Sequence, residues 1–352
     1  MKLFKNISIL AVVATAAVLL VTSCNFNNTG SNNASNSYHD TAHQTDLLSG
    51  GVQLIPVKTP KGTFNVWTKR VGNNPTIKVL LLHGGPGATH EYFECFDSYF
   101  PNANIEYFYY DQMGSAYSEN PNDSSLWNID QFVEEVETVR QALHLDSSNF
   151  YLLGHSWGGI LATEYALKYQ QNLKGLIISN MVPSIPDYVK YANEVLGPKL
   201  PPAVLAKIRS YEAKGDYTNP EYLGVIQEYY YPEHILRMPP ATWPDPVKRA
   251  FAKMNYPLYL KMQGPSEFGV VGDAVLKNWD RKADLAKIKV PTLSIGGEFD
   301  TMDPKAMEAL SKAVQHGQYL YCPKGSHMSM YDDQLTYFTG LIKFIKDVDA
   351  KK

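Results

Sequence analysis

Three polar residues that lie far apart in the sequence have the types and the order that nucleophilic hydrolysis requires. They are Ser156, Asp300 and His327, and Ser156 lies in a G-x-S-x-G pattern with Gly154 and Gly158. A serine hydroxyl is a weak nucleophile that needs a base, and the base needs an acid that orients it. The order serine, acid, histidine is one of the known orders of such a triad. We therefore predict that Ser156 is the nucleophile, His327 the general base and Asp300 the orienting acid.

The surroundings of Ser156 predict a sharp turn between a strand and a helix. An apolar run at 150–153 precedes the serine, and a helical pattern covers 158–169. A nucleophile on such a strained turn needs neighbours with little or no side chain, because the strand and the helix approach closely there. His155 is adjacent to the serine in sequence but should point elsewhere, so we expect it to be structural.

A glycine-rich loop is predicted to stabilise the oxyanion of the reaction. The apolar run 77–82 ends at the segment 83–87, which reads His-Gly-Gly-Pro-Gly. Glycines allow the backbone to come close to a substrate. When the nucleophile lies on a turn between a strand and a helix, two backbone N–H groups can hold the oxyanion. One comes from such a loop, and the other comes from the residue after the nucleophile. We therefore predict Gly85 and Trp157 as the oxyanion donors, and we expect His83 to brace the loop by hydrogen bonding.

The acid and the histidine of the predicted triad also follow strand patterns. Asp300 comes after the apolar run 290–295, and His327 comes after the run 318–322. Because the carboxyl ends of parallel strands meet at one edge of a sheet, both side chains can converge on the serine. Two nearby acids are less well placed and are the alternatives to Asp300: Glu298 and Asp303.

The elements that must position these residues alternate between strand and helix patterns. Segments 52–57 and 62–69 predict a hairpin, and segment 129–143 has helical spacing. Continuous apolar runs follow at 77–82, 105–110, 150–153, 173–179, 290–295 and 318–322, and a last helix pattern covers 331–348. Such runs between helices are typical of a mostly parallel sheet that helices cover on both faces.

One long segment interrupts the alternation of strands and helices. Residues 183–287 are rich in proline, tyrosine and helix-like pieces and contain no clear buried strand. We predict that this segment is a helical cap inserted after the sixth strand. The α/β core then comprises residues 47–182 and 288–352.

Composition and charge exclude several classes of protein. The 352 residues are 44% apolar and 19% charged, with a formal net charge of −3, which excludes a disordered polymer and a collagen-like repeat. No basic run stands out in the body of the chain, so nucleic acid is not an expected partner. The sequence has no metal-ligand spacing and no nucleotide-binding loop, so we expect no metal and no cofactor.

Cys95 and Cys322 either form a disulfide or remain free buried thiols.

The first residues predict a signal that targets the protein to the bacterial cell envelope. Two lysines precede an apolar stretch at 7–21, which is short for a membrane span. The stretch ends in Val-Thr-Ser before Cys24, which resembles the lipobox of bacterial lipoproteins. We predict a lipoprotein signal peptide at 1–23, lipidation of Cys24 as the only membrane contact, and a flexible Asn/Ser-rich tether at 24–46. The alternative is an ordinary secretory signal with a chance cysteine.

Four motifs occur in one order and together resemble the proline iminopeptidase family of α/β-hydrolases, especially its tricorn-interacting aminopeptidase branch. They are the loop 83–87, the segment 111–118 that begins with Asp-Gln, the turn around Ser156, and the Gly-Glu-Phe-Asp segment 297–300. The resemblance covers roughly residues 50–350. It implies the α/β-hydrolase fold with an inserted cap, and hydrolysis of an N-terminal residue, often proline, from short peptides.

The resemblance also implies a binding site for the free α-ammonium group of the substrate. Family members hold this group with acidic side chains, and one of them is the glutamate of a Gly-Pro-x-Glu-Phe segment, which here is 264–268. That role carries over to Glu267, and a carboxylate in a desolvated aromatic cap recognises a charged amine strongly. Thr301 stands where the tricorn-interacting relatives have a second amine-binding glutamate. Glu91, just past the glycine-rich loop, is a candidate substitute for that second carboxylate.

Two other functions remain open at the level of the sequence. A serine esterase, amidase or lactonase would use the same triad on a small ester or amide. A lipid-tethered binding protein on an inactive hydrolase scaffold belongs to a different class, and the complete triad disfavours it. Dehalogenases and epoxide hydrolases share the fold but use an aspartate nucleophile, and Ser156 argues against both.

Overall fold

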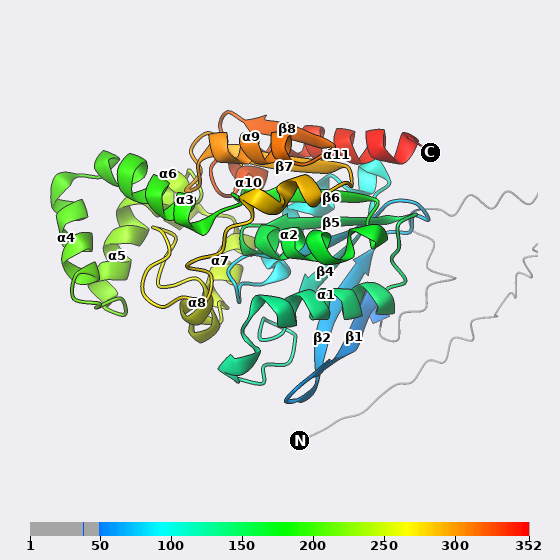
Figure 1. Cartoon of the computed structure of the whole chain (residues 1–352), viewed down its shortest axis with the longest axis horizontal. Helices are drawn as coiled ribbons and strands as arrows, with labels where there is room; N and C mark the ends of the chain where they lie inside the picture. Colours follow the sequence, from blue (N-terminus) through cyan, green and yellow to red (C-terminus); the bar gives the residue numbers. More distant parts are fainter. Residues whose placement is uncertain (1–37, 39–48, 352) are drawn as a thin grey trace, which may run out of the picture. The chain divides into compact units, whose positions relative to one another are not determined.

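The computed structural model describes Tyr38 and residues 49–351 (Figure 1). The predicted signal peptide 1–23, the lipidation site Cys24 and, except for Tyr38, the tether 24–46 lie outside the described residues. Within the described part of the chain, none of the helices combines the length and the apolar character that crossing a membrane requires.

An eight-stranded sheet forms the centre of the fold, with the strand order β1-β2-β4-β3-β5-β6-β7-β8. The first two strands form an antiparallel hairpin, β2 pairs antiparallel with β4, and all later neighbours are parallel. The mostly parallel sheet predicted from the apolar runs is therefore confirmed. The strands are β1 (Val52–Thr59), β2 (Gly62–Val71), β3 (Lys78–Leu82), β4 (Glu106–Asp111), β5 (Phe150–His155), β6 (Gly175–Ser179), β7 (Thr292–Gly297) and β8 (Gly317–Cys322).

Helices cover both faces of the sheet because successive side chains of each buried strand point to opposite sides. In β3, Leu80 and Leu82 belong to one buried apolar cluster, whereas Val79 and Leu81 belong to a second one. The first cluster includes residues of α1 (Ile129–Ala142), α2 (Trp157–Tyr169) and α9 (Pro304–Ala313). The second includes residues of the 3₁₀ segment η2 (His90–Ser98), α10 (Ser329–Asp332) and α11 (Gln334–Ala350).

The two remaining cysteines are both free thiols. Cys95 is half-buried and Cys322 is buried. Of the two alternatives that the sequence left open, the structure therefore has the unpaired one.

Six α-helices lie between β6 and β7, in the segment where the sequence predicts the cap. They are α3 (Ile185–Tyr191), α4 (Pro202–Glu212), α5 (Pro220–Tyr229), α6 (Tyr231–His234), α7 (Asp245–Ala252) and α8 (Tyr256–Met262). Several begin with a proline in their first turn, where the missing N–H costs nothing. We use the term cap for this helical segment below.

The two ends of the cap lie side by side. Ser184 and Asp280 form an isolated antiparallel bridge, and the Ser184 hydroxyl donates to Asp280 Oδ2 at 3.0 Å. The N–H of Ile185 donates to the carbonyl oxygen of Trp279 at 2.8 Å. Because β6 and β7 are also neighbours in the sheet, the chain leaves and re-enters the core at nearly the same place.

Candidate active site

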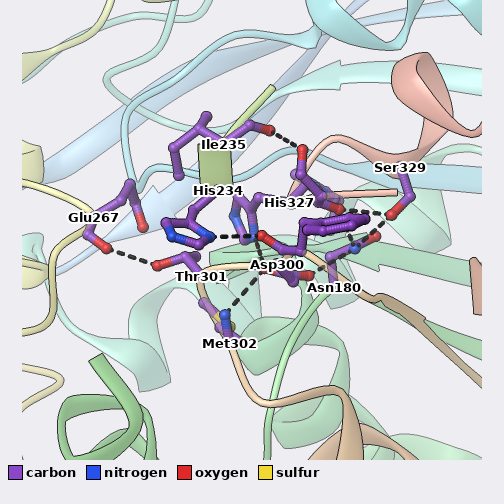
Figure 2. A network of polar contacts seen from close by, with 12 residues as sticks. Asn180, His234, Ile235, Glu267, Asp300, Thr301, Met302, His327 and Ser329 are labelled. Carbon is purple, nitrogen blue, oxygen red and sulfur yellow. Dashed lines mark hydrogen bonds and ion pairs between the residues drawn. The ribbon is translucent and has the colours of Figure 1, made fainter. Parts of the chain in front are cut away.

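The structure brings Asp300 and His327 into direct contact at one edge of the sheet. Ser156 follows β5, Asp300 follows β7 and His327 follows β8, and these parallel strands end at the same edge. His327 Nδ1 lies 2.9 Å from Asp300 Oδ1, and both side chains are buried (Figure 2). A carboxylate oxygen only accepts, so Nδ1 carries the hydrogen and Nε2 is left to act as a base.

The charge on Asp300 also raises the pKa of His327. Burial lowers the pKa of His327, but the negative charge of Asp300, its hydrogen bond and the nearby Glu267 together raise that pKa above its ordinary value. The imidazolium form is therefore stabilised, which is what a base that must hold a proton during the reaction requires.

Asn180 is a partner of Asp300 that the sequence analysis missed. Its side-chain amide donates to Asp300 Oδ2 at 2.8 Å and to the carbonyl oxygen of Ser326 at 3.0 Å (Figure 2). Asn180 follows β6 with a positive φ of 53°, a conformation that asparagine tolerates better than most residues. A polar residue directly after a buried apolar strand was the signal available in the sequence.

The two alternative acids do not contact the histidine. Asp303 caps α9 by accepting from the backbone N–H of Lys305 at 2.9 Å. Glu298 accepts from the Tyr321 hydroxyl at 2.7 Å near the surface. Of the three candidate acids, Asp300 alone is hydrogen-bonded to His327.

Ser156 occupies a strained turn between β5 and α2. Its φ and ψ are 57° and −126°, and α2 begins at the next residue. Only glycine fits at the two flanking positions, because a Cβ at Gly154 would overlap the carbonyl oxygen of Gly158, and a Cβ at Gly158 would overlap that of Leu82. The serine Oγ makes no hydrogen bond to a described residue. Such contacts are commonly loose before substrate binds.

The predicted oxyanion donors lie on either side of this serine. A Cβ at Gly84 would come within 2.9 Å of the Cβ of Ser156, so the glycine-rich loop packs directly against the nucleophile. Gly85 has φ 107°, a conformation that favours glycine. Among the described residues, the backbone N–H groups of Gly85 and Trp157 have no hydrogen-bond acceptor. Both donors are therefore available to a substrate oxygen.

Two further histidines at the site are buried and neutral. His83 bonds the carbonyl oxygen of Gly84 through Nδ1 at 2.9 Å, and burial lowers its pKa to about 4. His155 bonds the carbonyl oxygen of His327 through Nε2 at 2.8 Å, and burial together with the nearby His327 lowers its pKa to about 3. The geometry agrees with the bracing and structural roles expected for these residues.

A cavity of about 150 Å³ joins this edge of the sheet to the cap. Ser156 and His327 line it from the core, and Glu267 lines it from the cap. The rest of its wall is mainly apolar and aromatic, and includes Tyr92, Leu223, Tyr231, Phe251, Met254 and Tyr259.

Glu267 is held in place by tyrosines from three cap helices. The Tyr259 hydroxyl donates to its Oε1 at 2.7 Å, and the Tyr188 hydroxyl donates to its backbone oxygen at 2.5 Å. Its own N–H donates to the Tyr231 hydroxyl at 3.4 Å. Burial raises the pKa of Glu267, and His327 and the Tyr259 hydrogen bond offset this only in part. A cationic ligand would therefore be a favourable partner for this carboxyl.

Thr301, where the resemblance implies a second amine-binding glutamate in some relatives, contacts the backbone of Glu267. Its hydroxyl donates to the Glu267 backbone oxygen at 2.8 Å (Figure 2). The same hydroxyl lies 2.6 Å from the Tyr230 hydroxyl. No motif in the sequence predicted that tyrosines would surround Glu267. The high tyrosine content of the cap was the only sign of it.

The position of Glu91 contradicts the expectation that it supplies a second carboxylate for the substrate. Glu91 is buried against the cap, where its Oε1 accepts from Arg249 at 2.5 Å and from Lys253 at 2.6 Å. Burial alone would raise the pKa of Glu91, but the hydrogen bonds from Lys253 and Arg249 hold it below its ordinary value. Its charge is neutralised by cations of the same chain, and it does not line the cavity.

The described residues contain no group of three or more histidine, cysteine, aspartate or glutamate side chains that could hold a metal ion.

Comparison with known proteins identifies close relatives along most of the chain. A family model of the alpha/beta hydrolase fold matches residues 78–202. A proline iminopeptidase of Elizabethkingia meningoseptica is 59% identical over 298 residues, which cover 85% of this chain and 99% of that relative. One from Flavobacterium johnsoniae is 56% identical over 299 residues, with the same two coverages. A solved proline iminopeptidase from Mycobacterium smegmatis has a TM-score of 0.75 at 27% identity and covers 85% of this chain and 99% of its own.

Proposed function

The chain belongs to the proline iminopeptidase family of α/β-hydrolases, and we propose that it releases N-terminal proline from short peptides with Ser156, His327 and Asp300 as its catalytic residues. The chain is accordingly a serine aminopeptidase. One observation carries the proposal: Ser156 and His327 line the same small cavity as the buried carboxyl of Glu267. A shared cavity suits a substrate whose ammonium group lies next to the bond that is cleaved.

Acylation begins when His327 takes the proton of the Ser156 hydroxyl. The serine Oγ then attacks the carbonyl carbon of the N-terminal residue, and the N–H groups of Gly85 and Trp157 hold the resulting oxyanion. The protonated His327 gives its proton to the amide nitrogen, the C–N bond breaks, and the shortened peptide leaves. Asp300 stabilises the imidazolium because its carboxylate accepts the Nδ1–H hydrogen bond.

Deacylation uses the same groups on a water molecule. His327 takes a proton from the water, and the hydroxyl oxygen attacks the carbonyl carbon of the acyl-serine ester. The second oxyanion collapses, the bond to Ser156 Oγ breaks, and His327 returns the proton to the serine. The free amino acid and the resting enzyme are the products.

Selection of an N-terminal residue rests on Glu267. Its carboxylate pairs with the substrate ammonium inside an apolar, aromatic wall, where a charge-assisted hydrogen bond is strong. A peptide with a blocked amino group has no charge to offer and leaves the buried carboxyl unpaired. The small volume of the cavity favours proline or another small apolar residue at this position.

The test compares a prolyl arylamide, an alanyl arylamide, an N-acetylprolyl arylamide and a short acyl ester as substrates of the same preparation. We expect fast release of the arylamine from the prolyl substrate, slower release from the alanyl one and very little from the acetylated one. Equal turnover of the free and the acetylated prolyl substrates would contradict a site for the ammonium group. Hydrolysis of the ester alone would assign the chain to the second candidate function, a serine esterase.

We further propose that Cys24 is lipidated and anchors the protein in the bacterial cell envelope. The support is the sequence: an apolar stretch at 7–21, small residues before the cysteine, and an Asn/Ser-rich segment after it. Cys24→Ser should move the protein from the membrane fraction to the soluble fraction when cells are fractionated. Membrane association that survives this substitution would contradict the proposal.

A further inference from the structure

Gln112 lies between the two halves of the predicted oxyanion hole. It follows β4, whereas His83 follows β3 and the turn that leads to Trp157 follows β5. The sheet order places β4, β3 and β5 next to one another. Gln112, which is 1% exposed, can therefore reach across three neighbouring strand ends.

Three hydrogen bonds join Gln112 to both halves. Its side-chain Nε2 donates to the carbonyl oxygen of His83 at 2.9 Å, and its Oε1 accepts from the indole Nε1 of Trp157 at 2.7 Å. Its backbone N–H donates to Nε2 of His83 at 3.1 Å. Because an indole N–H only donates and a carbonyl only accepts, the orientation of the amide group is determined without ambiguity.

The backbone N–H of Gln112 also fixes the tautomer of His83. That ring accepts at Nε2, so its hydrogen is on Nδ1, which donates to the carbonyl oxygen of Gly84. The carbonyl of Gly84 and the N–H of Gly85 belong to one planar peptide group. Holding the carbonyl therefore sets the direction in which the Gly85 N–H points.

The indole of Trp157 is fixed in a similar way on the other side. Gln112 holds its N–H, and the ring of Phe132 packs edge-on against it with centroids 5.6 Å apart. Trp157 is the first residue of α2, so an immobile side chain limits movement of the backbone N–H at that position.

The loop that carries Gln112 is itself anchored in the core. The N–H of Met113 donates to Glu135 Oε1 at 2.8 Å, and the Tyr110 hydroxyl donates to the same oxygen. Glu135 is fully buried, and its Oε2 has no partner among the described residues. Burying a carboxyl without a cation lowers stability. The hydrogen bonds that it accepts from Met113 and Tyr110 offset part of this cost and anchor the loop.

From these contacts we propose that Gln112 is a positioning residue, which aligns the N–H groups of Gly85 and Trp157 with the oxyanion of the transition state. The inference rests on the proposed function only in that both require Ser156 chemistry. An ester and a peptide form the same oxyanion. The effect of Gln112 should therefore appear on any substrate that the enzyme hydrolyses.

The first test replaces Gln112 with methionine, which has a similar volume and forms no comparable hydrogen bonds. Removal of one oxyanion donor costs roughly 100- to 1,000-fold in kcat, and misalignment should cost less. We expect kcat for Gln112→Met to fall by roughly 10- to 100-fold on both prolyl arylamide and ester, with KM nearly unchanged. The affinity for a prolyl boronic acid, which forms a tetrahedral adduct with the serine, should fall by a similar factor.

A second variant addresses the case in which Gln112→Met folds poorly. Trp157→Phe removes the indole N–H together with part of a buried ring and keeps the backbone donor. We expect a loss in kcat of less than about tenfold, and a lower melting temperature because the smaller ring leaves a cavity. In the double variant, Gln112→Met should cost less than it does in the parent, because one of its contacts is already absent.

The control is Gln170→Met, which removes a bridging glutamine far from the site. Gln170 donates to the carbonyl of Lys287 at 3.0 Å and accepts from the N–H of Lys289 at 2.7 Å. This variant should keep the parent kcat. Parent-like kcat and boronate affinity in Gln112→Met, or a rise in KM alone, would overturn the proposal. A parent enzyme that hydrolyses only the ester would contradict the proposed function and still allow this test.

Discussion

The core side and the cap side of the cavity hold their functional groups by different means. On the core side, the triad and the oxyanion donors follow strands that end at one edge of the sheet, and backbone groups, neutral side chains and the Asp300 carboxylate fix them. On the cap side, two hydroxyls from separate helices hold Glu267: that of Tyr259 donates to its carboxyl and that of Tyr188 to its backbone oxygen. The sheet thus determines the geometry of one side, and helix packing determines that of the other.

This difference separates the groups that carry out the reaction from the group that selects the substrate. In the proposed mechanism, the core groups act on the carbonyl that every ester or amide substrate presents, whereas Glu267 acts on a charge that only some substrates carry. Changes on the core side should therefore affect all substrates alike. Changes on the cap side should affect them unequally.

Ser156→Ala should have the largest effect and should not distinguish between substrates. Members of such a triad act as a unit, so we expect kcat to fall by roughly four orders of magnitude or more for arylamide and ester alike. Steady-state kinetics on both substrates, with circular dichroism as a check of the fold, measures this. Near-normal hydrolysis of either substrate would show that the nucleophile is another residue.

Glu267→Gln should separate the substrates. Removing one partner of a buried ion pair typically costs about 3–5 kcal/mol, and a retained amide recovers part of this. We expect kcat/KM for the prolyl arylamide to fall by roughly 10- to 1,000-fold, at about 1.4 kcal/mol per tenfold change. Turnover of a short ester should be spared.

The same pair of assays shows how this expectation would fail. Equal losses on both substrates would mean that Glu267 supports the cap structurally. No loss on either would remove it from the binding site.

Glu135→Gln tests the core side without any substrate, through stability. Burial raises the pKa of Glu135 from 4.5 to about 7, so the folded state keeps this proton in a range where the unfolded chain has lost it. The free energy of unfolding therefore falls as pH rises from about 4.5 to about 7 and loses no more above that range. Across this range the loss amounts to about 3 kcal/mol, which the glutamine variant should not show.

Urea unfolding at pH 5 and pH 8 gives the difference in the free energy of unfolding between the parent and Glu135→Gln. The change in that difference between the two pH values measures the loss. Other titrating groups are common to both proteins and cancel. A difference that is the same at both pH values would mean that Glu135 is ionised in the folded protein.

Tyr259→Phe should have the smallest effect and should again be confined to substrates with a free amino group. The variant loses the hydroxyl that donates to Glu267 Oε1, and because this bond lowers the pKa of Glu267, less of the carboxyl will be ionised. We expect roughly a tenfold loss in kcat/KM on the prolyl arylamide. Tyr256→Phe is the matched control, since Tyr256 lines the same cavity but donates to the carbonyl of Pro265 at 3.3 Å.

The two sides also differ in how far the sequence predicts them. The positions of Ser156, Asp300 and His327 follow from local motifs at strand ends, because a parallel sheet brings such ends together. Glu267 was identified through resemblance to a family. No periodicity or spacing pointed to it.

Some hydrogen-bond partners of Glu267 and Glu91 could not be predicted, because they lie far away in the sequence. The hydroxyl of Tyr188 meets the backbone of a residue 79 positions away. Glu91 was assigned to the substrate because it follows the glycine-rich loop, whereas its partner Arg249 lies 158 positions along the chain. Such pairings arise only after the cap has folded onto the core, so they leave no trace in a local pattern.

The bridge between Ser184 and Asp280 has a consequence for how such enzymes diversify. A segment whose two ends lie side by side can be lengthened, shortened or exchanged by recombination of the coding sequence while the flanking strands keep their places. Descendants of one ancestral gene can thus keep the same reaction and acquire new substrate specificities. The same junction is a practical splice point for grafting the cap of one relative onto the body of another.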